Sequence, residues 1–380
     1  MTGEPGQRGS ETVLDPKPGK GPSSTETSPD PSAGVDLSAP SLPSLASRMR
    51  SLPPRRVLVF GKSRKRSRQT SGKVEAFEAQ GCRVEWINLA RLRRRHGRKR
   101  APEVAWRAFQ RFAPDLVFTT FPDLPLELMK RIGETTPVAQ WCEQVLDPLT
   151  EEHVQLLAQS DFPLITNPVY VTALEKRGYR HAVPALEGFS RTWHHRVPAR
   201  KVVRDVAFLG GPGRNKQRAD FLFQLAERHG ITVFGRGWDK LGSLPPGLRI
   251  EKPVATKGFR RVCAESRIVL GLNDTNEDPG YWSDRTVLSL ACGAFHLTHY
   301  VPGLEEVFED GKHLAWYRDL EECDQKIRHY LDHPEERVRV ADAGHDLVHL
   351  RHRWHDRVAD IFRLIRTRTE LSGQRESPTD

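Results

Sequence analysis

The chain has 380 residues, a length that suits two domains, and its hydrophobic fraction of 37% includes no apolar run long enough to span a membrane. Its five cysteines form no Cys-x-x-Cys pair and its first ten residues have no apolar core. These features argue against a disulfide framework, a zinc knuckle and a signal peptide, and they favour the cytoplasm. The formal net charge is +10, and it is concentrated, because sixteen Lys or Arg and three Glu lie between residues 55 and 100.

The first 52 residues are rich in Pro, Gly, Ser and Thr. Ten of the 28 prolines lie in residues 1–54, and no aromatic residue precedes Phe60. Such a segment cannot bury enough apolar surface to offset the entropy lost on ordering. The sequence therefore predicts a disordered tail over residues 1–52.

Short apolar segments alternate with helical patterns in the next part of the chain. The predicted strands cover residues 57–60, 83–87, 115–118, 138–141, 162–166 and 182–184, and the predicted helices residues 72–80, 104–112 and 124–132. Strands that alternate with helices indicate a parallel sheet. Residues 53–192 are therefore expected to form a first Rossmann-like domain.

The same alternation restarts after residue 200. Strands are predicted over residues 206–209, 231–234, 267–272 and 294–298, and helices over residues 218–229, 286–291, 320–331, 335–352 and 354–366. We assign residues 200–350 to a second Rossmann-like domain, 351–367 to a final helix and 368–380 to a flexible tail. Ligands of such sheets bind beyond the carboxyl ends of the strands, so two facing domains would leave a binding cleft.

One glycine-rich turn has the placement of a phosphate-binding loop. Gly210, Gly211 and Gly213 follow a predicted strand and precede a helix, with Arg214, Lys216 and Arg218 close behind. Backbone N–H groups and these cations would suit a diphosphate, although an ordinary turn has the same pattern. The Gly61-Lys62-Ser63 segment is no P-loop, because Arg56 stands where that motif needs glycine.

Other polar groups give weaker signals. The carboxylates of Asp123, Glu143 and Asp147 follow predicted strands of the first domain and suit an acceptor-side base, although such acids are often helix caps. His345, His349 and His352 share a helical face, but no HExxH pattern accompanies them. We interpret them as a surface stripe and predict no metal site.

The cationic segment suggests an anionic partner. It comprises Arg91, Arg93, Arg94, Arg95, Arg98, Lys99 and Arg100. An anionic acceptor, the inner face of a membrane, or a solvated basic surface would each fit this charge. No nucleic-acid-binding motif is present and no aromatics are interleaved with the cations, so nucleic acid is not an expected partner.

Seven ordered blocks of the second half resemble the CgeB-like glycosyltransferases of the GT-B superfamily. The most specific is Arg-Thr-Val-Leu-Ser-Leu-Ala-Cys-Gly-Ala-Phe-His-Leu-Thr at residues 285–298. The others cover residues 205–210, 267–273, 303–308, 311–314, 334–337 and 352–357. The resemblance is close over residues 205–360 and only general over 55–190.

This resemblance implies a GT-B fold and the transfer of a sugar from a nucleotide-sugar, which is the only small molecule expected besides the acceptor. The second domain would hold the donor, and the last helix would cross back to the first domain. Metal would be unnecessary, because cations and helix N-termini stabilise the leaving diphosphate. The implied donor residues are Gly210, Gly211, Arg214, Arg218, Asn273, Arg285 and Gly293, and Asp123 and Glu143 lie on the acceptor side.

The sequence departs from the family at two positions. The family has Glu three residues after the motif arginine, where it reaches the ribose, and here Leu288 replaces it. Related retaining enzymes have a second Glu eight residues earlier, where Gly280 stands. No catalytic residue can be assigned, and a non-catalytic GT-B protein that binds a nucleotide or glycan is the alternative to an active transferase.

Overall fold

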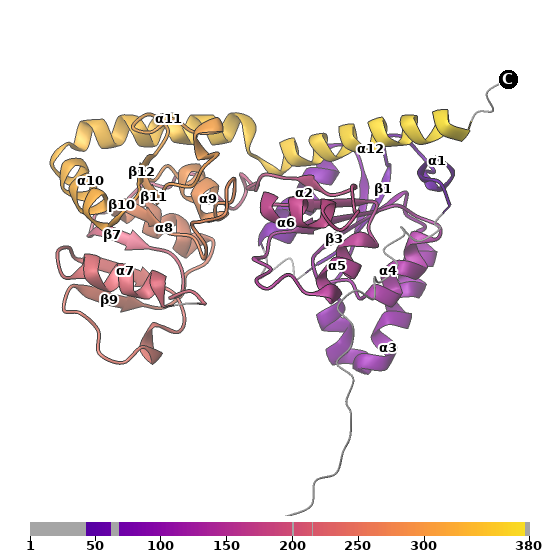
Figure 1. Cartoon of the computed structure of the whole chain (residues 1–380), viewed down its shortest axis with the longest axis horizontal. Helices are drawn as coiled ribbons and strands as arrows, with labels where there is room; N and C mark the ends of the chain where they lie inside the picture. Colours follow the sequence, from indigo (N-terminus) through magenta and orange to yellow (C-terminus); the bar gives the residue numbers. More distant parts are fainter. Residues whose placement is uncertain (1–42, 62–67, 200, 215, 377–380) are drawn as a thin grey trace, which may run out of the picture. The chain divides into compact units, whose positions relative to one another are not determined.

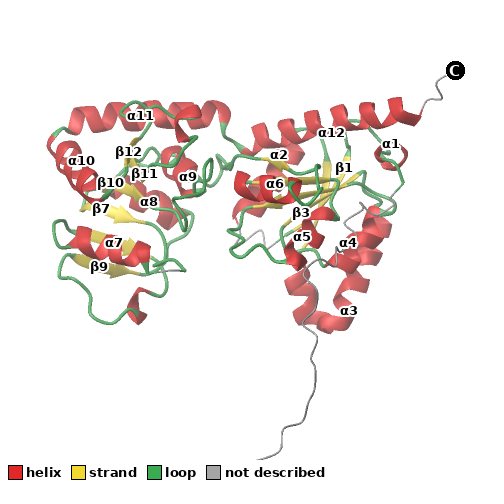
Figure 2. Cartoon of the chain, viewed as in Figure 1, coloured by secondary structure: helices red, strands yellow, loops and turns green. Residues whose placement is uncertain are grey.

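Two six-stranded parallel sheets organise the chain (Figure 1). The computed structural model describes residues 43–61, 68–199, 201–214 and 216–376. Each sheet is flanked by helices, shown in red around the yellow strands in Figure 2. The predicted architecture of two Rossmann-like α/β domains is therefore confirmed. No helix in these ranges is long and apolar enough to cross a membrane.

The first sheet has the order β2-β1-β3-β4-β5-β6, and all its pairings are parallel. Its strands match the six predicted ones: β1 (Arg56–Phe60), β2 (Arg83–Ile87), β3 (Leu116–Thr120), β4 (Val138–Cys142), β5 (Phe162–Ile165) and β6 (Val183–Pro184). Its helices are α2 (Arg68–Ala79), α3 (Leu89–Phe112), α4 (Leu126–Gly133), α5 (Glu151–Ala158) and α6 (Pro168–Glu175). The strand order reverses between β1 and β3, which makes their carboxyl ends the topological switch point.

The second sheet has the order β12-β11-β10-β7-β8-β9, with its switch point between β7 and β10. The four predicted strands are β7 (Arg204–Phe208), β8 (Ile231–Phe234), β10 (Ser266–Gly271) and β11 (His296–His299). The sequence missed β9 (Leu248–Glu251) and β12 (Ala315–Tyr317). Both are short edge strands, and neither has the long apolar run that marks a strand buried on both faces.

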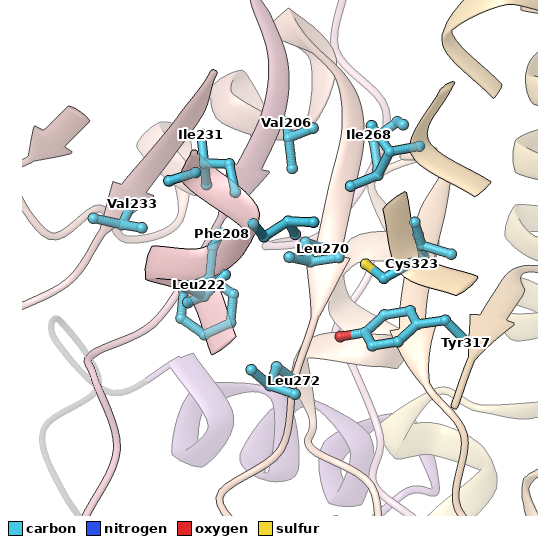
Figure 3. Close-up of a cluster of buried hydrophobic side chains, with 14 of the residues drawn as sticks. Val206, Phe208, Leu222, Ile231, Val233, Ile268, Leu270, Leu272, Tyr317 and Cys323 are labelled. Carbon is cyan, nitrogen blue, oxygen red and sulfur yellow. The ribbon is translucent and has the colours of Figure 1, made fainter. Parts of the chain in front are cut away.

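The helices of this domain are α7 (Gln217–Ala226), α8 (Lys257–Glu265), α9 (Arg285–Ala291), α10 (Leu320–Asp332) and α11 (Pro334–Arg351), with 3₁₀ turns η1 (Trp238–Lys240) and η2 (Leu304–Glu306). Alternate residues of β7 enter two separate cores. Val206 and Phe208 pack with Leu222 of α7 (Figure 3), whereas Ala207 packs with Val262 of α8. Both faces of the sheet are therefore covered, as parallel sheets require.

Helix α12 (Trp354–Glu376) completes the core of the first domain. Trp354, Val358, Ile361 and Ile365 repeat at helical spacing, and all four are buried against the first sheet and α2. The expectation that the last helix crosses back to the first domain is thereby confirmed. The helix also continues beyond residue 367, into the segment expected to be a tail.

Part of the expected N-terminal tail is ordered. Residues 1–42 lie outside the described residues, but α1 (Leu45–Arg48) follows them directly. The Arg48 guanidinium is buried, forms an ion pair with Asp161 and donates to the carbonyl of Gly133 at 2.9 Å. Leu45 and Met49 also pack against the core of the first domain. Composition could not reveal this docking, because it depends on contacts with residues that are distant in sequence.

Helix α3 begins at Leu89 and therefore contains the basic segment, although the sequence predicted a helix only over residues 104–112. Two helical stretches join at Gly97, whose φ of 79° interrupts the helix. The first stretch was missed because its cations show no apolar periodicity. All seven cations are exposed, and none forms an ion pair with any of the described residues.

Candidate functional site

Two loops meet at the switch point of the second sheet. The glycine-rich loop, residues 210–213, follows β7, and a longer loop with Asn273 and Asp274 follows β10 and leads to α9. These are the adjacent strands between which the strand order reverses. Ligands of open parallel sheets bind at this position, so the structure brings several sequence-predicted residues to one candidate site.

The glycine-rich loop packs against the end of β8 with no space for side chains. A Cβ on Gly235 would lie 2.0 Å from the carbonyl oxygen of Gly210. Trp238 also donates its indole N–H to that carbonyl at 2.9 Å. A Cβ on Gly210 itself would lie 2.8 Å from the Arg285 guanidinium. The loop backbone is thus held in place, with Arg285 immediately beside it.

Arg218 holds the two loops together. Its guanidinium lies 2.7 Å from Asp274 and donates to the carbonyl oxygens of Asn273 and Gly211, each at 3.3 Å. Burial, and then the neighbouring charge of Arg285, lower the pKa of Arg218 from 12.5 to about 10. The sequence grouped Arg218 with the phosphate-facing cations, whereas the described contacts give it a supporting position.

Arg285 is the cation that remains available at this site. It is half-buried at the first residue of α9, and its guanidinium carbon lies 5.8 Å from the Phe208 ring centroid. The described residues offer it no ion pair, in contrast to Arg218. A half-buried guanidinium beside a glycine loop and without a carboxylate partner suits an anionic group.

Asn273 presents a second available donor group. The residue is 3% exposed, and its Oδ1 accepts the backbone N–H of Ser283 at 2.8 Å. That bond orients the amide, while Nδ2 has no partner among the residues described. Buried amide groups are normally hydrogen-bonded, so an unpartnered one at a switch point is a candidate ligand contact.

The remaining predicted donor residues are less closely associated. Arg214 is exposed at the end of the glycine-rich loop. Gly293 lies just beyond the opposite end of α9 from Arg285, and its φ of 74° provides a structural reason for glycine there. No described contact places either residue against Arg285, so their donor-binding roles stay predictions.

The sequence missed a buried polar pair next to the site. His296 and Thr298 on β11 lie beside Gly271, where a Cβ would approach their side chains within 2.6 Å and 2.5 Å. Burial, and then the charge of Arg285, lower the pKa of His296 to about 3, which keeps it neutral. A strand-internal His-x-Thr pair carries no sequence signal, so only packing could reveal it.

Leu288 lies one turn along α9 from Arg285. It is 7% exposed and belongs to the apolar core between the sheet and helices α8 and α9. The family's Glu therefore has an apolar, buried replacement in this chain. The structure gives the departure a packing role, and the described residues place no carboxylate on α9 itself.

The acceptor-side residues lie at the carboxyl edge of the first sheet. Asp123 is in the loop after β3 and Glu143 directly follows β4, and both are half-buried. Glu143 forms an ion pair of 3.0 Å with Lys73 of α2, a residue that the sequence did not single out. Lys73 carries no motif signal, since its burial arises from the packing of α2.

The histidines at 345, 349 and 352 do not form a common surface stripe. His349 lies 3.1 Å from the carbonyl oxygen of Ala291, and His352 is buried and stacked on Phe308. Burial lowers the pKa of His352 to about 4. Across the described ranges no three His, Cys, Asp or Glu side chains gather as metal ligands would.

Comparisons with known proteins identify the fold. Residues 214–363 match the glycosyl transferase-like family. HepE from Anabaena, solved with UDP-glucose, is 12% identical over 85% of this chain and 99% of its own, with a TM-score of 0.55. Sucrose-phosphate synthase from Thermosynechococcus elongatus is 11% identical over 82% of this chain and 98% of its own, with a TM-score of 0.58.

A glycosyltransferase from Rickettsia africae is similar at 10% identity, with 82% and 98% coverage and a TM-score of 0.56. No curated protein matches the chain. At such low sequence identities, the TM-scores are what establish a shared architecture. The chain therefore has the GT-B fold, and most of its second domain matches a glycosyltransferase-like family, as the sequence motifs predicted.

Proposed function

We propose that this GT-B protein is a glycosyltransferase that transfers a hexose from a nucleoside-diphosphate sugar. The observation that carries the proposal is Arg285, a half-buried cation beside the Gly210 backbone with no acidic partner in the described ranges. The family match over residues 214–363 includes this arginine. HepE, which shares the fold, was solved with UDP-glucose.

In this proposal the donor residues have different tasks. Arg285 binds the diphosphate, Gly210 and Gly211 allow close approach of the backbone, and Asn273 donates from Nδ2. Arg214 adds exposed positive charge, and Arg218 holds the loops in register. Charge on the leaving diphosphate is stabilised by these groups without a bound metal or cofactor. The motif at residues 285–298 supports a CgeB-like subtype.

A second function is favoured by Leu288. A buried leucine cannot accept a hydrogen bond from a ribose hydroxyl, so the chain would bind a nucleotide or glycan without turning it over. Binding and turnover separate the two functions. An active transferase both binds a nucleoside diphosphate and slowly hydrolyses its sugar conjugate, whereas the non-catalytic protein only binds.

The test is calorimetric titration of UDP, GDP and TDP into wild type, Arg285→Ala and the control Arg249→Ala, whose side chain is exposed on β9. Loss of a charge-assisted hydrogen bond of about 1.5–3 kcal/mol predicts a roughly tenfold to hundredfold weaker affinity for Arg285→Ala alone. Equal binding by wild type and Arg285→Ala would show that the donor site is misplaced. A wild type that binds none of them would contradict the proposal.

The same proposal places the acceptor beside Asp123 and Glu143 and assigns the basic segment of α3 to an anionic lipid surface. The protein would then be cytoplasmic and peripheral on the inner membrane face. The support is electrostatic, because all seven cations are exposed and unpaired within the described residues. The segment contributes no large exposed apolar side chain, so binding would depend on charge and weaken with salt.

Co-sedimentation with phosphatidylglycerol and phosphatidylcholine vesicles tests this surface. Serine replacing Arg91, Arg94, Arg95 and Arg98 should abolish binding to the anionic vesicles and spare UDP binding. A control with serine replacing Arg249, Lys252, Lys257 and Arg261 removes four exposed cations of the second domain and should bind like wild type. Wild-type protein that does not sediment with the anionic vesicles would contradict the membrane proposal.

A further inference from the structure

A buried lysine organises the carboxyl edge of the first sheet. Lys73 is 1% exposed, and its Nζ donates to Glu143 Oε2 at 3.0 Å and to Thr120 Oγ1 at 3.3 Å. The ammonium also lies over the indole rings of Trp141 and Trp354, at 5.6 Å and 4.6 Å from their centroids. A buried charge is strongly unfavourable without such partners, so these four groups fix where the ammonium sits.

Glu143 receives the charge of Lys73 but is not enclosed with it. Its side chain is 33% exposed, compared with 1% for Lys73. Only Oε2 is engaged, and Oε1 makes no hydrogen bond within the described residues. The carboxylate thus has one oxygen held by the protein and one open, at the strand edge where ligands of parallel sheets bind.

Glu187 is a second buried carboxyl group whose charge is coupled to this pair. It follows β6 and is 5% exposed, and its Oε2 has no partner in the described residues. Burial, and then the neighbouring Glu143, raise the pKa of Glu187 well above its usual range. Among the described residues, the ion pair of Lys73 is therefore with Glu143, and Glu187 forms none with the ammonium.

Resting on the proposed transferase function, we infer that Glu143 takes the proton of the acceptor hydroxyl and that Lys73 is the residue that positions Glu143. The acceptor oxygen bonds to the anomeric carbon while its proton passes to Oε1. The bond from that carbon to the diphosphate oxygen breaks, and its electron pair leaves with the diphosphate, which Arg285 faces. The donor domain offers no replacement at the family positions, which hold Gly280 and the buried Leu288.

Water can replace the unidentified acceptor, so UDP-α-glucose hydrolysis is the assay, followed as UDP release. Glu143→Gln should lower the rate about a hundredfold or more, because positioned bases contribute roughly 10²–10⁴. Lys73→Met keeps the length of the side chain and should lower the hydrolysis rate roughly tenfold. Neither variant should change the affinity for UDP. Glu152→Gln, an exposed carboxylate on α5, is the matched control and should match wild type.

The double variant separates positioning from a general structural role. If Lys73 acts through Glu143, Lys73→Met should cause no further loss in the Glu143→Gln background. Additive losses, or a Glu143→Gln protein with the wild-type rate, would overturn the inference. If circular dichroism shows that Lys73→Met does not fold, the hydrolysis rate of Glu143→Gln and the anomer of the released glucose test the inference instead.

Proton removal on the acceptor side accompanies direct displacement, so proton NMR should detect β-glucose before it mutarotates. The α-anomer appearing first would overturn the inference, and so would UDP-glucose that wild type binds but never cleaves. Failure of the proposed function gives a different result, because a wild type that binds no nucleoside diphosphate has no donor site at all.

Discussion

The two domains have nearly the same sheet but opposite chemistry at its carboxyl edge. In the first, Glu143 forms an ion pair with the buried Lys73, and the buried carboxyl of Glu187 is close enough to affect and be affected by their charges. In the second, Arg218 and Arg285 lie around a glycine-rich loop. The same parallel topology thus presents a carboxylate at one edge, which we propose accepts a proton, and arginines at the other edge, which we propose bind an anion. Function is determined by the residues at the strand ends, whereas the sheet only determines where they stand.

The domains also differ in where their cores come from. The buried core residues of the second domain lie between β7 and α11 apart from Phe189, which shortly precedes β7, whereas the first domain incorporates four residues of α12 from the end of the chain. The first domain therefore depends on a segment far away in sequence. Substitutions can test both this asymmetry and the chemical difference between the two edges.

The largest effect is expected for Trp354→Ala. Trp354 is 1% exposed, packs edge-on against Trp141 at 4.9 Å and donates to Gln69 at 2.7 Å. Its loss should destabilise the first domain by about 3–5 kcal/mol, as for other buried aromatics. Hydrogen exchange should accelerate in β1 and stay slow in β7. Leu350→Ala, at an exposed position of α11, should change neither, and equal acceleration in both strands would refute the asymmetry.

Gly235→Ala should damage the anion-binding edge. Its Cβ would lie 2.0 Å from the Gly210 carbonyl, so the glycine-rich loop must move. We expect at least a tenfold loss of UDP affinity by calorimetry. Gly230→Ala is the control, because its Cβ would meet nothing within 4 Å. Wild-type affinity in Gly235→Ala would mean that this loop does not contact the nucleotide.

Arg218→Ala should lower the stability of the fold, whereas Arg214→Ala should mainly weaken UDP binding. Arg218→Ala leaves Asp274 without its partner, and since that side chain is 32% exposed we expect a loss of about 2 kcal/mol of unfolding free energy, below the value for fully buried pairs. Arg214 is exposed, so Arg214→Ala should change stability by less than about 0.5 kcal/mol and weaken UDP binding a few-fold. Urea unfolding measures the stability of both variants, and calorimetric titration measures their UDP affinity. An Arg214→Ala protein that is less stable than Arg218→Ala would contradict these assignments.

The two edges should respond to pH with opposite sign. The pKa of His296 is about 3 when folded and near 6.5 when unfolded, so the unfolded state binds the extra proton between these values and stability falls as pH decreases. From pH 7 to pH 5 this amounts to roughly 2 kcal/mol. The pKa of Glu187 is raised in the fold, so its contribution is present at low pH and is lost as pH rises above about 4.5.

Melting temperatures at pH 5, 7 and 8 check these signs. His296→Gln should lose less stability than wild type at pH 5, and Glu187→Gln should lose less as pH rises to 8. His333→Gln, at an exposed position, should follow wild type throughout. Identical pH profiles for wild type and both buried variants would contradict the assigned protonation states.

The sequence alone was enough to predict ten of the twelve described strands and the family motif around Arg285. Runs such as Val57–Phe60 and Val206–Leu209 are apolar because parallel strands are buried on both faces, so pattern and position agree. The motif around Arg285 is local as well, since the turn before α9 and the helix itself are adjacent in sequence. Features that depend on neighbours along the chain could therefore be predicted.

Tertiary structure decided which charged groups are buried and what they pair with. Arg214 and Arg218 are four residues apart, yet one is exposed and the other holds two loops together. Lys73 has no sequence signal, and its ion pair with Glu143 spans 70 residues. The physical reason is that burial and pairing arise from the packing of distant segments, which a linear pattern of residue types does not encode.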